Sequence, residues 1–81
     1  MGRRDEKLIS KIESKPFRHD IQFNELEKYY NLHGYFAEKQ DGTSHVQFKN
    51  SANGIRVTVK KENPVKVSYV AQAVKIVKQE A

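Results

Sequence analysis

Residues 45–60 read HVQFKNSANGIRVTVK, and two alternating segments in this stretch decide the expected fold. The first segment runs from residue 43 or 44 to residue 49 and places apolar Val46 and Phe48 between polar neighbours. The second segment, residues 55–59, alternates β-branched apolar residues with polar ones. A period of two is typical of a strand with one face buried and one face in water. The loop NSANG between them is rich in turn formers, so the two strands are predicted to form an antiparallel pair.

The same alternation predicts which side chains of this pair face water. The inward, apolar set is Val46, Phe48, Ile55, Val57 and Val59. The outward set is His45, Gln47, Lys49, Arg56, Thr58 and Lys60. We call the solvent side of the sheet the open face. A strand is also expected at residues 35–40, with a turn at Asp41-Gly42 leading into the next strand. Its orientation is ambiguous, because Tyr35 and Phe36 are both large and apolar.

Helices are predicted on both sides of these strands. Their apolar periodicity places them at residues 4–14, 23–33 and 66–79. Asn24 with Glu27 resembles a capping box, and Gly34 is a natural end for the second helix. The apolar stripe of the last helix is Val67, Val70, Ala71, Val74 and Val77. The predicted order α-α-β-β-β-α makes an α+β fold, in which helices cover one face of a three-stranded antiparallel sheet.

Composition limits the classes of function. The 81 residues are expected to form a single domain, residues 1–81, with a thin core and a site on its surface. No cysteine is present, and no apolar run approaches the roughly 20 residues of a membrane span, so a cytoplasmic protein is expected. The formal net charge is +5. Residues 34–61 hold five basic and two acidic side chains, which places the excess on the sheet and favours a polyanionic partner.

His45 is the candidate for chemistry on this face. A strand histidine is most simply an exposed polar residue, but an imidazole can accept and donate protons near neutral pH. The cations Lys49, Arg56 and Lys60 could hold RNA phosphates beside it. Ser44 is not expected to act as a nucleophile with His45, because adjacent strand residues point to opposite faces, unless Ser44 still belongs to the turn.

Other candidates carry weaker signals. His19 and His33 lack metal-site spacing relative to His45, so neither a metal nor another cofactor is expected. Five aromatic residues could stack on bases but are more simply core residues, with Tyr69 kept as a possible surface contact: Tyr29, Tyr30, Tyr35, Phe36 and Tyr69.

Four stretches together resemble the HicA-type mRNA interferase toxins of bacterial toxin–antitoxin modules. They are HDIQFNELEKYYNLHGY, DGTSHVQFKN, GIRVTV and NPVKVSYVAQAVKIVKQ, within residues 19–79. The Gly-x-Ser-His motif, formed by Gly42, Thr43, Ser44 and His45, is the most specific of them. The helix at residues 4–14 is an accessory to this core. Where many members carry Pro-x-His after the third strand, this chain has Val59-Lys60-Lys61.

The resemblance implies a fold similar to a double-stranded-RNA-binding domain and a metal-independent endoribonuclease that cleaves mRNA with a single catalytic histidine, His45. It also implies a type II toxin–antitoxin system, in which a HicB-type antitoxin covers the His45 face. The expected RNA-binding residues are Gln47, Lys49, Arg56, Thr58 and Lys60, with Gly42, Thr43 and Ser44 supporting the motif. The alternatives are a non-catalytic RNA-binding module of the same fold and a plain interaction protein with an acidic partner.

Overall fold

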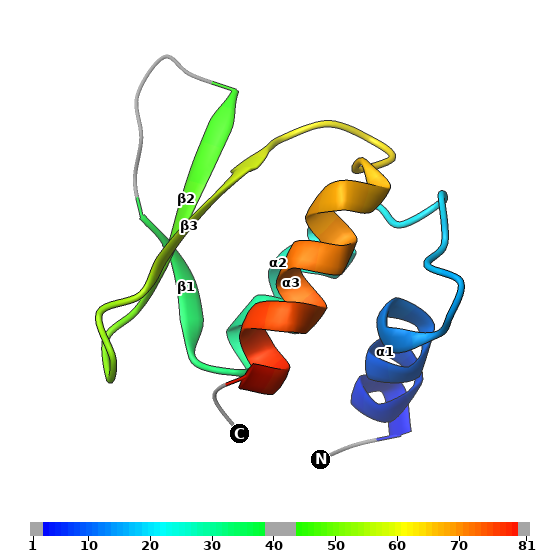
Figure 1. Cartoon of the computed structure of the whole chain (residues 1–81), viewed down its shortest axis with the longest axis horizontal. Helices are drawn as coiled ribbons and strands as arrows, with labels where there is room; N and C mark the ends of the chain where they lie inside the picture. Colours follow the sequence, from blue (N-terminus) through cyan, green and yellow to red (C-terminus); the bar gives the residue numbers. More distant parts are fainter. Residues whose placement is uncertain (1–2, 39–43, 80–81) are drawn as a thin grey trace.

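The computed structural model describes residues 3–38 and 44–79. Its elements follow the predicted order and are α1 (Arg3–Glu13), α2 (Phe23–Leu32), β1 (Tyr35–Glu38), β2 (His45–Asn50), β3 (Arg56–Lys60) and α3 (Val67–Gln79). Figure 1 shows three layers, with α2 and α3 lying between the sheet and α1. The predicted α+β class is therefore confirmed. No helix in the described part of the chain is long and apolar enough to cross a membrane.

The sheet is an antiparallel meander in the order β1-β2-β3. In the second ladder, Val46 pairs with Val59 and Phe48 with Val57. Phe48 and Val59 are fully buried and Val57 nearly so, while Val46 packs against the core from a half-buried position. These side chains face α2 and α3, as the alternation predicted. The Asp41-Gly42 turn between β1 and β2 lies outside the described residues.

Two helices supply the other half of the core. Helix α2 buries Phe23, Leu26 and two tyrosines on one face, and α3 buries Val70, Ala73, Val74 and Val77. The rings of Tyr30 and Phe48 stack with centroids 4.8 Å apart, which joins α2 to the middle of β2. Helix α2 ends at Leu32, with His33 as its C-cap, and Gly34 follows with a φ of 87°, in the left-handed region that glycine adopts without strain.

Helix α1 packs against α2 and α3, and it contributes the fully buried Ile12 to the core. Its Lys11 donates a hydrogen bond of 2.7 Å to Glu25. Burial alone would raise the pKa of Glu25, but the hydrogen bonds from Lys11 and from the Gln22 backbone outweigh it and lower that pKa. The helix that the resemblance marks as an accessory is thus tied into the body of the domain.

Adjacent tyrosines in α2 are both inaccessible to solvent but differ in their hydroxyl contacts. Tyr29 donates a hydrogen bond of 2.6 Å to Glu13. Burial, with the Glu13 carboxylate beside it, raises the pKa of Tyr29. The Tyr30 hydroxyl is buried without a hydrogen-bond partner among the described residues, and burial raises its pKa as well. We therefore expect the two hydroxyls to change the free energy of unfolding in opposite directions.

Three local predictions are wrong. The capping contact of α2 is not Asn24 with Glu27; the Glu25 carboxylate instead accepts a 2.9 Å hydrogen bond from the Gln22 N–H, because the helix begins at Phe23. Ile55 is 38% exposed, since it lies beyond the paired part of β3.

Asn50 was expected in the loop, but it ends β2 and is buried. Its side-chain oxygen accepts a 2.8 Å hydrogen bond from the Ala52 N–H, so a polar side chain closes the turn from inside. Tyr69, kept as a possible surface contact, is half-buried and packs against the core.

Candidate nucleic-acid interface

The strand register brings the six predicted open-face residues together. Three cross-strand pairs run along the β2–β3 ladder, and they are His45 with Lys60, Gln47 with Thr58, and Lys49 with Arg56. Each of these residues is exposed or half-exposed. The described helices all lie on the other side of the sheet (Figure 1). A row of polar and basic side chains is therefore accessible to a large ligand.

Strand β1 adds two residues that the sequence left unassigned. Phe36 pairs with Lys49 and Glu38 with Gln47, so both share the open face. Their neighbours Tyr35 and Ala37 point to the other side, where Tyr35 is fully buried. The missing signal was the register of β1, since two adjacent aromatic residues made its alternation unreadable.

The charge on the open face is positive but partly compensated. The Arg56 Nε lies 3.7 Å from Glu38 Oε1, and the Lys60 Nζ lies 3.7 Å from Glu62 Oε2. In both pairs the cation is exposed and the carboxylate is partly exposed, and ion pairs of this kind contribute little and can be exchanged for another anion. No ion pair to Lys49 occurs within the described part of the chain. Lys49 is therefore the cation on this face that is most readily available to a phosphate.

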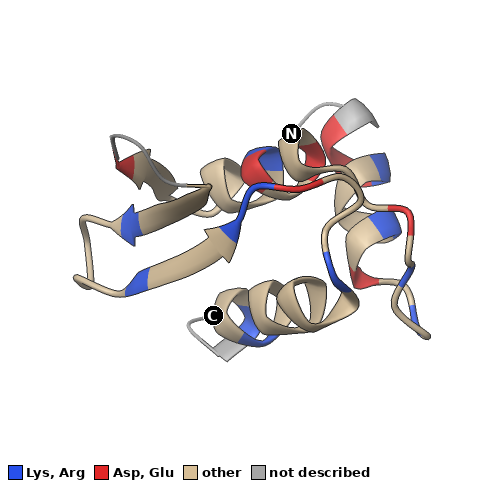
Figure 2. Ribbon diagram, turned by 90° about the horizontal axis from the view of Figure 1, so that it is seen from above, with Lys and Arg blue, Asp and Glu red and all other residues tan. Residues whose placement is uncertain are grey.

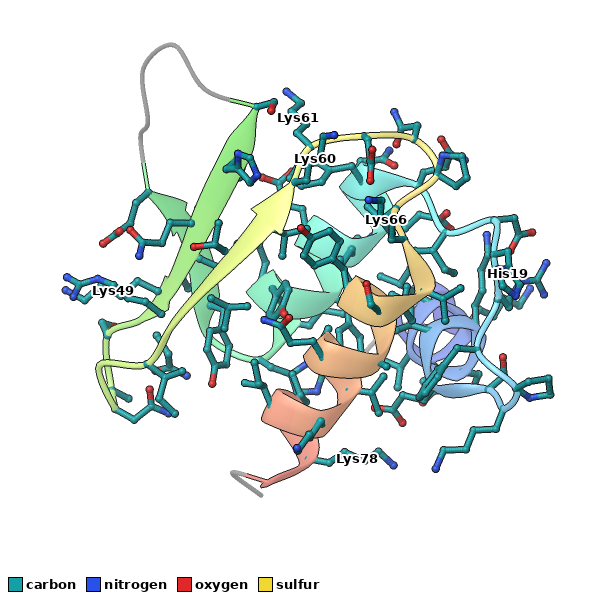
Figure 3. The ribbon with its side chains drawn as sticks, turned by 45° about the horizontal axis from the view of Figure 1, so that its top comes forward. His19, Lys49, Lys60, Lys61, Lys66 and Lys78 are labelled. Atoms are coloured by element: carbon teal, nitrogen blue, oxygen red, sulfur yellow. The ribbon has the colours of Figure 1, made fainter. Side chains whose placement is uncertain are left out.

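The cations are distributed along the length of the face. Figure 2 shows basic residues at both ends of β3, which begins at Arg56 and ends at Lys60. Figure 3 shows Lys49 pointing away from the helices, at the opposite end of the ladder from Lys60 and Lys61. An extended polyanion fits this spacing better than a compact one.

A groove opens at the His45 end of the face. It lies where the start of α2, the ends of β1 and β2 and the segment after β3 meet. Its lining residues are Gln22, Phe23, Asn24, Glu27, Ala37, Glu38, His45, Val46, Lys61 and Asn63. Asn63 is held there by accepting a 2.7 Å hydrogen bond from the Phe23 N–H. The groove therefore combines His45 with two carboxylates, one lysine and several amides.

Of the Gly-x-Ser-His motif, Ser44 and His45 are described, whereas Gly42 and Thr43 lie outside the described residues. Ser44 precedes β2 and is exposed. Its carbonyl oxygen accepts a 2.6 Å hydrogen bond from the Lys61 N–H, which continues the β2–β3 ladder by one residue. The motif thus positions Lys61 at the rim of the groove.

The remaining histidines lie elsewhere. His19 is exposed in the connector between α1 and α2, on the far side of the molecule from the sheet (Figure 3). The His33 ring nitrogen Nδ1 lies 2.9 Å from the Tyr29 carbonyl oxygen, at the end of α2. Within residues 3–38 and 44–79, no three His, Asp or Glu side chains are grouped in a way that could hold a metal ion.

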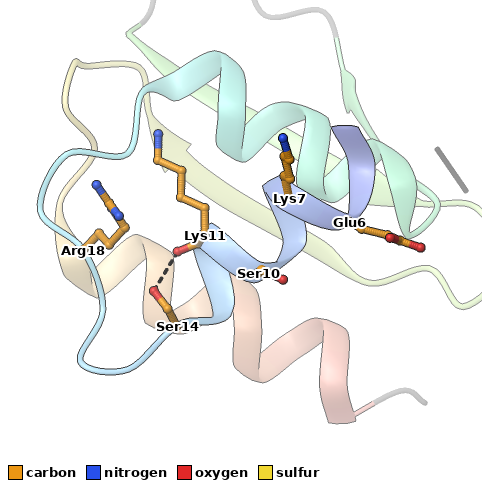
Figure 4. A pocket seen from close by; sticks show the side chains of 6 residues that line it. All are labelled: Glu6, Lys7, Ser10, Lys11, Ser14 and Arg18. Atoms are coloured by element: carbon orange, nitrogen blue, oxygen red, sulfur yellow. Dashed lines mark hydrogen bonds between the residues drawn. The ribbon is translucent and has the colours of Figure 1, made fainter. Parts of the chain in front are cut away.

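A second hollow lies beside α1 and is lined by Glu6, Lys7, Ser10, Lys11, Ser14 and Arg18 (Figure 4). Two of its charged groups, Lys11 and Arg18, are already engaged by neighbouring carboxylates. Arg18 donates two 2.7 Å hydrogen bonds to Asp20, and these lower the pKa of Asp20 to about 2. Lys11 is bound to Glu25, and the Ser14 hydroxyl donates to the Lys11 carbonyl oxygen. This arrangement stabilises the helix and its connector.

Comparison of the chain with protein-family models, with curated proteins and with solved structures finds no match. The function is therefore argued from the chemistry of the open face and its groove.

Proposed function

We propose that the protein is a metal-independent endoribonuclease that acts on mRNA in the cytoplasm, as the toxin of a type II toxin–antitoxin system. The observation that supports it best is the β2–β3 register, which pairs His45 with Lys60 on an exposed face that also carries Lys49 and Arg56. A proton-transferring imidazole beside phosphate-binding cations is the combination that phosphodiester cleavage requires. A HicB-type antitoxin would cover the same face.

The proposed reaction uses the RNA's own 2′-hydroxyl as the nucleophile. One group removes the 2′ proton, the 2′ oxygen attacks the phosphorus, and the bond to the 5′ oxygen breaks. A second group gives a proton to that leaving oxygen, so the products are a 2′,3′-cyclic phosphate and a 5′-hydroxyl. His45 takes one of these two roles. Lys49, Arg56 and Lys60 hold the phosphates, and Gln47 and Thr58 contribute hydrogen bonds between them.

Glu38 is the best candidate for the second proton-transferring group. It is the described carboxylate that both lines the groove with His45 and lies on the open face. Its pairing with Gln47, two residues from His45, places it on the diagonal neighbour position, a spacing of roughly 7–8 Å between strand residues. A scissile phosphate bound between the two side chains could reach both.

The test compares His45→Ala with His19→Ala. Both proteins are induced in bacteria and are also purified and incubated with RNA in buffer containing a metal chelator. We expect His45→Ala to lose growth arrest and to reduce cleavage by about 100-fold or more, the usual effect of removing a general acid or base. His19→Ala, which removes an exposed histidine far from the face, keeps both activities. Equal cleavage by the two variants would exclude His45 as the catalytic residue.

The second candidate is a non-catalytic RNA-binding module, with a fold similar to a double-stranded-RNA-binding domain. It is supported by the row of cations on the open face, which binds phosphate without any role for His45. It predicts RNA binding that weakens with salt and no cleavage by the wild-type protein. The cleavage assay above separates the two candidates directly.

A further inference from the structure

Phe36 is an exposed aromatic side chain on the open face. Its exposure is 58%, whereas Tyr29, Tyr30 and Tyr35 are inaccessible to solvent. Of the five aromatic residues that could stack on a base, Phe36 is therefore the one that the fold leaves on the sheet surface. An isolated exposed hydrophobic residue is common in soluble proteins, so exposure by itself is not the argument.

The position of Phe36 relative to the cations is the argument. Phe36 pairs with Lys49, and Lys49 pairs with Arg56, so the three residues form one row across β1, β2 and β3. Neighbouring strands lie roughly 4.8 Å apart, so the backbones of Lys49 and Arg56 lie about 5 Å and about 10 Å from that of Phe36, and their side chains leave the same face of the sheet. A nucleotide in a single strand offers the complementary arrangement. Its flat base could lie on the Phe36 ring, while the phosphates on either side of the base meet Lys49 and Arg56.

An aromatic ring beside a line of cations is how proteins bind unpaired nucleotides. Inside a duplex both faces of each base are covered by its stacked neighbours, so an aromatic ring on the sheet surface has no base face to stack on except at the duplex ends. We infer that Phe36 stacks on an unpaired base and that the open face selects single-stranded RNA over duplex RNA. This inference rests on the proposed function in RNA binding, and it names the class of RNA that the face takes.

A protein partner is the competing occupant of Phe36. Lysine is depleted in the buried centres of protein interfaces, where its ammonium group would lose its hydration. Lys49 lies directly beside Phe36 and has no ion pair in the described part of the chain. An apolar protein surface over Phe36 would bury this charge, whereas a nucleic acid supplies a phosphate for it; an antitoxin that covers the same face would have to supply carboxylates in place of the phosphates. The row therefore favours the nucleic acid.

The experiment measures binding of full-length wild type, Phe36→Ala, Phe36→Leu and Phe36→Trp by fluorescence anisotropy. The probes are a 12-nucleotide 2′-O-methyl RNA, which lacks the hydroxyl needed for cleavage, the same strand in a duplex, and an abasic strand of equal charge. We expect wild type to bind the single strand at least about five-fold more tightly than either other probe. Phe36→Ala should weaken single-strand binding by about 5- to 100-fold and leave the abasic strand unaffected.

Phe36→Leu keeps an apolar side chain without a ring and should bind the single strand as weakly as Phe36→Ala does. Phe36→Trp keeps an aromatic ring and should bind the single strand at least as tightly as wild type. Circular dichroism establishes that each variant is folded, and Phe36→Trp provides the test if the smaller side chains unfold the strand. If wild type binds the single and abasic strands equally, or if Phe36→Ala binds the single strand as tightly as wild type, the stacking inference is overturned while the proposed function stands. A protein partner would then be the occupant of Phe36. No binding of any probe by wild type would overturn the proposed function as well.

Discussion

Salt dependence provides a quantitative test of the open face as an RNA-binding surface. Each phosphate that a single strand gives to a protein cation contributes about 0.7 to the slope of log affinity against log salt. Neutralising Lys49, Arg56 and Lys60 together, each to Gln, should therefore reduce the slope by at most about 2. Between 50 and 200 mM salt, wild-type affinity should fall more than that of the triple variant, by a factor of up to roughly 20. Fluorescence anisotropy with a 2′-O-methyl strand measures both slopes.

The structure also ranks the single variants. Lys49→Gln should have the full effect of about 0.7, while Arg56→Gln and Lys60→Gln should each have less. The reason is that Arg56 and Lys60 each lie 3.7 Å from a carboxylate that competes with the phosphate.

The matched control neutralises Lys7, Lys15 and Lys75, which are exposed on α1, the following connector and α3. Both triple variants have a net charge of +2, because three positive charges are removed from +5. If the control lowers the slope as much as the open-face variant does, overall charge rather than this face binds RNA, and the reasoning is refuted.

Further predictions concern Glu38 and the two buried tyrosines. Glu38→Gln removes the carboxylate beside Arg56, so filter binding should show RNA affinity rising by about two- to five-fold, the energy of an exposed ion pair. Cleavage should nevertheless fall if Glu38 transfers a proton. Unchanged cleavage would mean that Glu38 acts only as the charge partner of Arg56. Tyr29→Phe should destabilise the fold by about 1.5 kcal/mol, because a hydrogen bond to the Glu13 carboxylate is lost. Tyr30→Phe should stabilise it by about 1 kcal/mol, because a buried hydroxyl without a partner among the described residues is removed. Thermal unfolding should show Tyr29→Phe as a fall of roughly 6–12 °C in the unfolding temperature and Tyr30→Phe as a rise of roughly 4–8 °C, and a loss of stability in both would contradict the assignment. The raised pKa of both phenols also predicts alkaline unfolding, since the unfolded chain releases these protons first. The contribution of the two phenols to the free energy of unfolding should be fully present below a pH of about 10. Above it, this free energy should decrease by at most about 1.4 kcal/mol per pH unit for each tyrosine. In urea titrations the Tyr30→Phe variant should lose less stability with rising pH than wild type.

The sequence by itself determined the order of the elements and the orientation of β2 and β3. Period-two alternation is a local property of each strand, so His45, Lys49 and Arg56 could be assigned to the open face without knowing what covers the other side. The apolar stripes of α2 and α3 are local in the same sense. Chemistry at His45 remains a proposal, since the geometry places the residue and the assays above test its role.

Tertiary structure decided what depends on pairing between distant residues. The orientation of β1 follows from its register with β2, because Tyr35 and Phe36 are equally apolar and differ only in which one the helices can cover. The same pairing brings Glu38 beside Arg56, 18 positions along the chain. Asn50 is buried because the strand and the turn close around its side chain. Such contacts form when separate segments pack together, so no local pattern in the sequence records them.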